Sequence, residues 1–595
     1  MNKLFCLTSL FCLFAVSMIA QTKETNQFTY RTSGLSQPIF VYNNWSAYDE
    51  LSDNIPLDEE LAMKELDNII RLKKEGVRID YYLMDAFWFD SKGGYRTWRK
   101  DCWPEGPQRW LEACKKNGLK PGLWFSTNLL KIGNEKNTLE VIPEWKNSVS
   151  EDGSTLCLFQ GGYLSHLMET LQIYVDWGVK LFKFDFAYFD AATSQAKRTM
   201  CSDEIKRRNK DAFFIALKEF RIKNPDVLLI GYNGFGGDME NTVTPFRKTI
   251  DLRWLEVFDT MYCGDPRLSD VPMMNFWRSQ DLYSDHMVFQ YLFNGVPIQR
   301  IDNCAFMIGT TGTCYNRALN AWHGMAVLAM ARGGWLNVYH GNIDLLSKKD
   351  AQWLAKLQKL YLPAQQFGRT KAWGGIPGKS LPYGYETITE NGILYTVVNA
   401  SQSKRMLHLP KPLKVKGKGR ILFHDDGFIP ILQNDSIVLG PEQLAVVGFG
   451  KFNDVNLDLG VEKDVVIPID IQKIETIIQV KDEHTLQAKY TPTKDKNIRI
   501  ILQQLDSDSI PFRSWGGAPP LGKSMDNFFK IEVKQGNKIL PQQESFNKII
   551  WCGLSWAVIE ISSKEISLNE DLYINCSIID GKSKNCKLRI FETMY

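Results

Sequence analysis

Between residues 38 and 364, short apolar runs alternate with longer stretches of helical periodicity. The stretch 58–74, for example, carries Leu66 and Ile69 on one predicted face. Short apolar runs bounded by polar residues are typical of buried strands, and their alternation with helices predicts a parallel α/β fold. Eight such strands are predicted, which is the number that closes a (β/α)8 TIM barrel. They are residues 39–42, 79–84, 120–125, 180–186, 227–232, 257–263, 296–301 and 335–339.

The pattern changes near residue 365. A last helix is predicted over 347–362, ending where Pro363 begins to disfavour it. Short alternating strands then predict an antiparallel β-sandwich over 365–450, and a further β-rich accessory domain over 451–595. We therefore expect a catalytic barrel at 38–364 followed by two β-rich units.

The amino-terminal segment predicts export. Lys3 precedes an apolar run over 4–19, and Ala20 is followed by polar residues. This pattern predicts a cleaved signal peptide over 1–20, with 21–37 as a linker, and an uncleaved anchor is the alternative. We expect a secreted or periplasmic protein with no integral membrane segment after signal cleavage.

Composition narrows the choice of partners. The 595 residues include 71 basic and 68 acidic side chains, a net charge of +3, without a basic block suited to phosphates. We therefore expect no nucleic-acid partner. Ten of the 12 cysteines lie outside the predicted signal peptide, and neither they nor the seven histidines show metal-ligand spacing. We expect no metal and no cofactor; structural disulfides stay open, and their pairing is not indicated.

Lys183 and Asp185 interrupt an apolar strand at alternate positions, so both side chains point to the same face. Paired in this way, the carboxylate would stay ionised and could act as a nucleophile; a structural salt bridge is the alternative. Polar and aromatic residues also follow the other predicted strands, which suits a polyhydroxylated ligand. The candidate site residues are Trp45, Asp85, Trp88, Trp124, Lys183, Asp185, Asn233, Tyr262, Asp265 and Asp302.

Five colinear motifs over residues 38–345 resemble the melibiase, or α-galactosidase, clan of glycoside hydrolases, families 27 and 36. Each motif alone is weak, but their order over eight strands is specific. The motifs are Asn44-Trp45, Asp85-x-x-Trp88, Trp98 to Asp101 with Trp103-Pro104-x-Gly106, Gly122-Leu123-Trp124, and Lys183-x-Asp185.

The resemblance implies a retaining exo-glycosidase that releases terminal α-linked galactose, or a closely related sugar, from oligosaccharides or glycans. It implies Asp185 as the nucleophile and Asp265 as the acid/base, because the mechanism needs one ionised and one protonated carboxyl. Lys183 is expected to hold Asp185 ionised. Asp281 is a rival acid/base, but Arg278 would lower its pKa, and we prefer Asp265.

Two positions depart from the clan. Ala86 stands where the clan commonly has a second aspartate, which binds the 4- and 6-hydroxyls of galactose. The loop that begins at Asn233 stands in place of the cysteine-containing loop that contacts the 2-position of the sugar in the clan. The alternatives are therefore an α-N-acetylgalactosaminidase, a β-L-arabinopyranosidase or a transglycosylase of the same clan. A non-catalytic glycan-binding barrel is the alternative of another class, although a binder has no need for a costly buried carboxylate pair.

Overall fold

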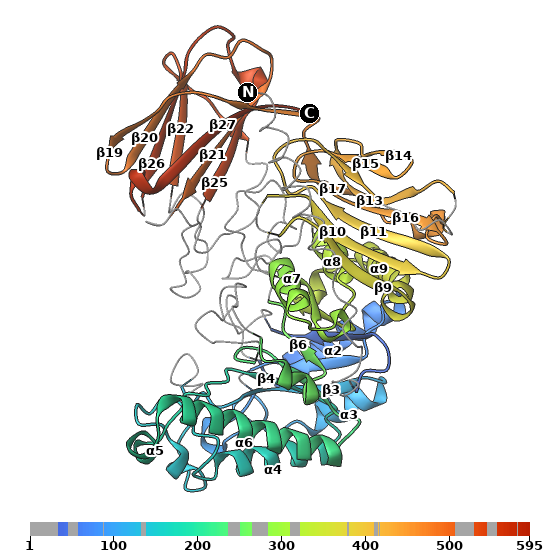
Figure 1. Ribbon diagram of the computed structural model, residues 1–595, viewed down its shortest axis with the longest axis vertical. Helices are drawn as coiled ribbons and strands as arrows, with labels where there is room; N and C mark the ends of the chain where they lie inside the picture. Colours follow the sequence, from blue (N-terminus) through green and yellow to red (C-terminus); the bar gives the residue numbers. More distant parts are fainter. Residues whose placement is uncertain are drawn as a thin grey trace, which may run out of the picture.

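The protein, analysed as a computed structural model, folds into three successive units (Figure 1). The predicted signal peptide, Asp265 and Asp281 lie outside the residues that the structure describes. Those are 34–45, 57–86, 88–131, 139–235, 250–264, 284–309, 322–377, 380–409, 415, 417–505, 529–543, 556–579 and 581–595.

The first unit is a (β/α)8 barrel, as predicted. All neighbouring strands are parallel in the order β6-β5-β4-β3-β2-β1-β8-β7, and a parallel bridge between Met261 and Ile301 closes the ring. The strands are β1 (Ile39–Asn43), β2 (Tyr81–Met84), β3 (Lys120–Ser126), β4 (Leu181–Asp185), β5 (Leu228–Gly231), β6 (Thr260–Met261), β7 (Asp302–Ile308) and β8 (Leu336–Gly341).

Side chains alternate between the two faces of each barrel strand. On β4, Phe182 and Phe184 pack outward against the helices, whereas Leu181 joins Ile230 and Val338 inside the barrel. The surrounding helices are α2 (Glu59–Lys74), α3 (Gln108–Lys116), α4 (Tyr163–Asp176), α5 (Ser194–Thr199), α6 (Ser202–Lys223), α7 (His286–Phe293), α8 (Trp322–Ala331) and α9 (Lys348–Phe367).

The seventh barrel strand begins later in the sequence than predicted. Residues 298–300 form a 3-10 helix after Pro297, and β7 begins only at Asp302. The strand starts with polar residues because their partners are internal: Asp302 accepts the backbone N–H of Cys263 at 2.6 Å, and Asn303 donates to the carbonyl of Gly334 at 2.8 Å. Asp302 therefore begins its strand, and the prediction that it follows the strand was wrong.

The last barrel helix also differs from the prediction. Helix α9 continues through Pro363 to Phe367. Tertiary contacts offset the hydrogen bond that proline removes, because the buried Gln365 bonds to Met330 O and Asn337 Oδ1, both at 3.0 Å.

Two β-rich units follow the barrel. In the second unit, β17 still pairs with β13, so this sheet extends past residue 450 to Ile467; the domain boundaries remain a prediction. Its strands are β9 (Arg369–Gly374), β10 (Tyr383–Thr389), β11 (Gly392–Val398), β12 (Arg405–His408), β13 (Arg420–Gly427), β14 (Ile431–Gln433), β15 (Ser436–Leu439), β16 (Leu444–Gly450) and β17 (Gly460–Ile467).

The third unit packs two antiparallel sheets around a core of its own, formed by residues such as Ile500 and Ile574. The first sheet has the order β18-β27-β21-β25-β24 and the second β19-β20-β26-β22-β23. Its strands are β18 (Asp470–Ile474), β19 (Ile478–Asp482), β20 (Thr485–Tyr490), β21 (Asn497–Gln504), β22 (Phe529–Gln535), β23 (Lys538–Ile539), β24 (Gln542–Gln543), β25 (Trp556–Ile561), β26 (Leu572–Ile578) and β27 (Cys586–Met594).

A buried ionic cluster joins the second unit to the barrel. Asp285, at the start of α7, pairs with Arg332 at 2.8 Å, and both side chains are at most 1% exposed. Tyr383 and Tyr385 of β10 each donate a hydroxyl proton to Asp285 at 2.8 Å. Arg332 also lies 3.6 Å from the sulfur of Cys263, next to β6. The sandwich therefore supports one strand end of the barrel.

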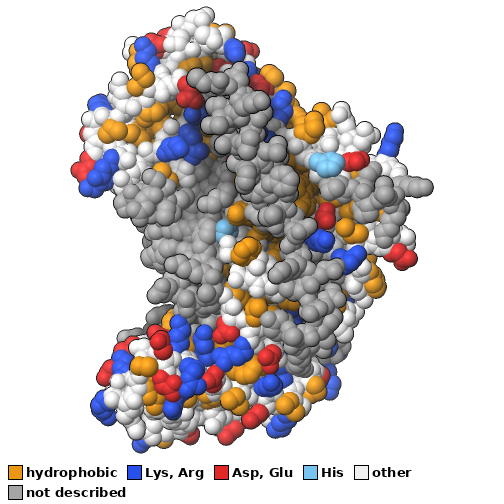
Figure 2. Space-filling view, viewed as in Figure 1, with side chains coloured by type: hydrophobic (Ala, Val, Ile, Leu, Met, Phe, Trp, Pro, Cys, Tyr) orange, Lys and Arg blue, Asp and Glu red, His pale blue; other side chains and the backbone are white. Residues whose placement is uncertain are grey.

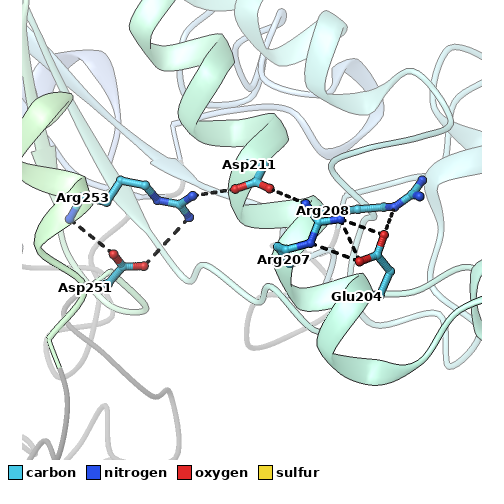
Figure 3. Close-up of polar contacts among 6 residues, drawn as sticks. All are labelled: Glu204, Arg207, Arg208, Asp211, Asp251 and Arg253. Atoms are coloured by element: carbon cyan, nitrogen blue, oxygen red, sulfur yellow. Dashed lines mark hydrogen bonds and ion pairs between the residues drawn. The ribbon is translucent and has the colours of Figure 1, made fainter.

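The outer helices carry a different kind of ion pair. Acidic and basic side chains are interspersed over the barrel helices on the face drawn in Figure 2. Part of this surface is a chain of exposed and partly exposed pairs between α6 and a 3-10 helix at Leu252–Glu256 (Figure 3). The chain comprises Glu204, Arg207, Arg208, Asp211, Arg253 and Asp251.

The two kinds of ion pair should differ in their effect on stability. Asp285→Asn removes the carboxylate that pairs with the buried Arg332, and we expect the free energy of unfolding to fall by about 3–5 kcal/mol. As a matched control, Arg207→Ala removes an arginine whose side chain is 60% exposed, which should cost about 1 kcal/mol or less. Denaturant unfolding of the wild type and both variants measures the difference; equal losses would contradict this assignment.

Candidate active site

The inward-facing positions near the carboxyl ends of the strands carry polar or aromatic side chains. Val41, Leu83 and Leu181 fill the layer below, so the residues two positions later on each strand share the same inward direction. Those later residues are Asn43 on β1, Asp85 after β2 and Lys183 on β4. The two-residue period of the strands therefore explains why these polar and ionisable side chains meet at the carboxyl end of the barrel.

Lys183 of β4 forms its ion pair with Asp85, which follows β2, two strands away in the barrel. The ammonium lies 2.8 Å from Asp85 Oδ2, and the two side chains are 4% and 1% exposed. It also lies 4.2 Å from the ring centre of Tyr232 and 5.8 Å from that of Trp45. The structure thus gives Lys183 an ion pair with Asp85, and its pairing with Asp185 stays a prediction.

N–H donors hold the carboxylate of Asp185, which is 7% exposed. Oδ1 accepts from the backbone of Phe186 at 2.9 Å and from the side chain and backbone of Asn233 at 2.8 and 3.3 Å. Oδ2 accepts from Trp124 Nε1 at 3.3 Å. Such donors suit the ionised form, which only accepts hydrogen bonds. They also fix the direction of a group that the sequence predicts to be a nucleophile.

The backbone directly after Asp185 is unusual. Phe186 has a φ of +49°, in the left-handed region that residues other than glycine rarely adopt. This conformation brings the N–H of Phe186 back to Asp185 Oδ1. Strained backbone that orients a reactive group is typical of functional sites.

His340 ends β8 on the same inward face and is fully buried. Burial, and then the nearby ammonium of Lys183, hold the pKa of His340 well below its usual range, so the imidazole is neutral. Within the described part of the chain, neither ring nitrogen has a hydrogen-bond partner. A neutral imidazole can both donate and accept, which suits a hydroxyl group.

Tyr262 and Tyr232 form one aromatic wall. Their rings stack with centres 4.3 Å apart, and the ring of Tyr232 also faces Lys183. Asp302 lies close to this wall, because its Oδ1 accepts the N–H of the residue after Tyr262. The structure thus brings Tyr262 and Asp302 to the same end of the barrel as Lys183.

Trp88 does not belong to this group. It is fully buried among aromatic rings on the helix side of the barrel, including Trp98 and Tyr174, 4.6 and 5.5 Å away. Its Nε1 donates to the carbonyl of Trp124 at 3.3 Å. Trp88 therefore packs beneath the site, and its prediction as a substrate-binding residue was wrong.

The residues before Asp265 are firmly held, although Asp265 itself lies outside the described residues. The carbonyl of Gly264 accepts from Ser284 Oγ at 3.0 Å. Gly264 has a φ of +101°, which disfavours a side chain at this position. The preference for Asp265 over Asp281 as the residue that faces Asp185 stays a prediction.

A buried carboxyl supports the site from the helix side. Glu65 of α2 is 1% exposed, and its Oε2 accepts from Tyr82 Oη and from Asn44 Nδ2. Tyr42 Oη lies 3.1 Å from Glu65 Oε1. Asn44 Oδ1 accepts the backbone N–H of Asp85 at 2.8 Å, which links the carboxyl to the ion pair.

Tyr232 and Glu65 were not among the predicted site residues. Tyr232 lies two positions after the inward-facing Ile230, so the strand period could have revealed it. Glu65 occupies the buried face of α2 together with Leu61 and Leu66. A charged residue among apolar neighbours on a helix face was the available signal.

Three further features of the described residues concern metal binding, membrane spanning and cysteine pairing. No group of three or more His, Cys, Asp or Glu side chains there could hold a metal ion, and no helix is long and apolar enough to span a membrane. The eight cysteines in those ranges are free thiols.

The sequence and the structure were compared with those of known proteins. No protein-family model and no curated protein matches the sequence. Among solved structures, the galactosidase domain of an α-galactosidase-sucrose kinase is 16% identical and matches 71% of this chain and 56% of its own, with a TM-score of 0.49. A GH36 α-galactosidase from Geobacillus stearothermophilus is 16% identical over 69% of this chain and 55% of its own, with a TM-score of 0.48.

The α-galactosidase from Lactobacillus brevis is 13% identical over 69% of this chain and 55% of its own, with a TM-score of 0.45. This chain thus spans little more than half the length of these structures. A likeness at this level carries no inference about substrate or mechanism.

The Glu65 carboxyl predicts a measurable pH dependence of stability. Burial raises its pKa from 4.5 to about 7, so the folded protein binds this proton more tightly than the unfolded chain. The stabilisation is present below pH 4.5 and is lost as the pH rises through about 7, a change of about 3 kcal/mol. Glu65→Gln removes this titration. We expect the free energy of unfolding to decline less from pH 4.5 to 7.5 in the variant; parallel profiles would contradict the raised pKa.

Proposed function

We propose that the protein is a retaining exo-glycosidase that releases a terminal α-linked galactose, or a closely related sugar, from oligosaccharides or glycans. The observation that carries the proposal is the buried group of Asp185, Lys183 and Asp85 at the carboxyl ends of barrel strands. In a (β/α)8 barrel this end holds the active site. A carboxylate fixed by four N–H donors suits attack on an anomeric carbon.

The mechanism assigns distinct work to two carboxyl groups. Asp185 attacks the anomeric carbon and forms a glycosyl-aspartate, while Asp265, our preferred acid/base, protonates the leaving oxygen. Asp265 then takes a proton from water, which attacks the intermediate, and two inversions give net retention. Lys183 and Asp85 bind sugar hydroxyls, and the aromatic faces of Trp45, Tyr232 and Tyr262 suit the apolar face of the ring.

Export is part of the proposal. The predicted signal peptide over 1–20 supports a secreted or periplasmic enzyme, which would meet oligosaccharides outside the cytoplasm. We assign no partner other than the carbohydrate substrate.

A second specificity is favoured by Ala86, which follows Asp85 where a second carboxylate would grip the 4- and 6-hydroxyls. Its methyl side chain offers no hydrogen bond, and its N–H is already bonded to Asp85 Oδ1 at 2.9 Å. A β-L-arabinopyranoside has the ring configuration of an α-galactoside but lacks the hydroxymethyl group. The site would suit that sugar because one anchor is missing.

A panel of aryl glycosides tests the proposal. We expect hydrolysis of the α-galactoside or the β-L-arabinopyranoside, with retained configuration by NMR, and Asp185→Ala should lower kcat by roughly 10⁴-fold or more. Circular dichroism checks that the variant folds. Binding of sugars without hydrolysis of any glycoside would support a glycan-binding barrel instead, and undiminished turnover by the variant would remove Asp185 from the mechanism.

The acid/base is identified by azide. In Asp265→Ala, an activated aryl glycoside should still form the glycosyl-enzyme, and azide should attack it to give a glycosyl azide of retained configuration. Asp281→Ala is the matched comparison. If only the Asp281 variant gives this product, the acid/base assignment moves to Asp281.

A further inference from the structure

Glu65 reaches two strand ends of the candidate active site from behind the barrel. Through Asn44, 3.2 Å away, it holds the backbone N–H of Asp85. Through Tyr42, it reaches the carbonyl of Gly341, which directly follows His340 and lies 2.9 Å from the tyrosine oxygen. We infer that Glu65 is a positioning residue, which as an uncharged carboxylic acid holds these strand ends in the geometry that binds the sugar.

The hydroxyl of Tyr42 supports the uncharged form. Its oxygen contacts two acceptors, Glu65 Oε1 at 3.1 Å and Gly341 O at 2.9 Å. A phenol has one proton and cannot donate to both. A carbonyl oxygen can only accept a hydrogen bond, so the Tyr42 hydroxyl donates to Gly341. The Glu65 carboxyl must then donate its own proton to the oxygen of Tyr42.

Among the described residues, Glu65 forms hydrogen bonds and no ion pair. The titratable groups that face it are Tyr42 of β1, Tyr82 of β2 and Asp344, whose charge disfavours ionisation further; Cys114 of α3 faces Tyr82. Lys64, the preceding residue, turns to the surface and pairs with Asp344 at 3.8 Å. Burial without a counter-charge favours the neutral acid.

Ionisation of Glu65 would disturb the link to Gly341. The carboxylate would accept the hydrogen bond of the Tyr42 hydroxyl, and the carbonyl of Gly341 would lose its donor. A negative charge would also appear behind Asp85, which is itself a buried anion paired with Lys183. Sugar binding should therefore weaken as the pH rises past about 7, whereas His340 stays neutral over this range.

Kinetics from pH 5 to 8 test the inference, which rests on the proposed glycosidase activity. On a glycoside that the wild type cleaves, KM should rise above pH 7. Glu65→Gln, which stays neutral and keeps a donor and an acceptor, should hold KM within about twofold of wild type at pH 6 and lose the alkaline rise. Glu65→Ala should raise KM roughly tenfold at pH 6, with a smaller change in kcat.

Tyr82→Phe is the matched control. It removes a hydroxyl from the same carboxyl but leaves the links to Asp85 and Gly341, so KM at pH 6 should stay within about threefold of wild type. An unchanged KM in Glu65→Ala, or an alkaline rise that persists in Glu65→Gln, would overturn the inference. If the alanine variant does not fold, the glutamine comparison alone decides.

A crystal structure of Glu65→Ala gives a readout that needs no turnover. We expect Asn44 to move and the distance from Lys183 to Asp85 to change from 2.8 Å. Unchanged positions of Asn44 and Asp85 would overturn the positioning role. If the proposed function itself is wrong, the wild type will cleave no glycoside, which distinguishes that outcome from failure of the positioning role.

Discussion

The buried ion pair between Lys183 and Asp85 is the interaction on which the site depends. Lys183 lies on β4 and Asp85 directly follows β2, so one contact links the two strands that flank β3 at the carboxyl end of the barrel. Removing either charge would break this buried pair, at a cost of about 3–5 kcal/mol. The pair also leaves Asp185 to its N–H donors, so the lysine serves substrate binding while the backbone and amide groups orient the nucleophile.

Support for this end of the barrel comes from two directions. On the α2 side, Glu65 holds the strand ends of β2 and β8 through neutral hydrogen bonds. On the opposite side, the Asp285–Arg332 pair and two tyrosines of the second unit secure the residues after β6. The sandwich is therefore structurally coupled to the segment that leads into Asp265, and neither support is expected to touch the sugar.

Much of the architecture could be predicted from the sequence, because strand period and helix period are local properties. The inward direction of Lys183 and Asp185 followed from their spacing alone. The partner of Lys183 could not be predicted, since it depends on how residues of next-but-one strands are aligned in the closed barrel. The start of β7 was missed because its polar residues have internal partners, and Trp88 was misplaced because an aromatic residue near a strand end can pack on either side.

Trapping of the covalent intermediate tests the central claim most directly. The wild type is incubated with a 5-fluoro glycosyl fluoride of the sugar that it cleaves, and the labelled protein is digested and sequenced by mass spectrometry. The account predicts one glycosyl group per chain, attached to Asp185. A label on another residue would contradict the assignment of the nucleophile, and turnover with inversion and no covalent species would contradict the mechanism.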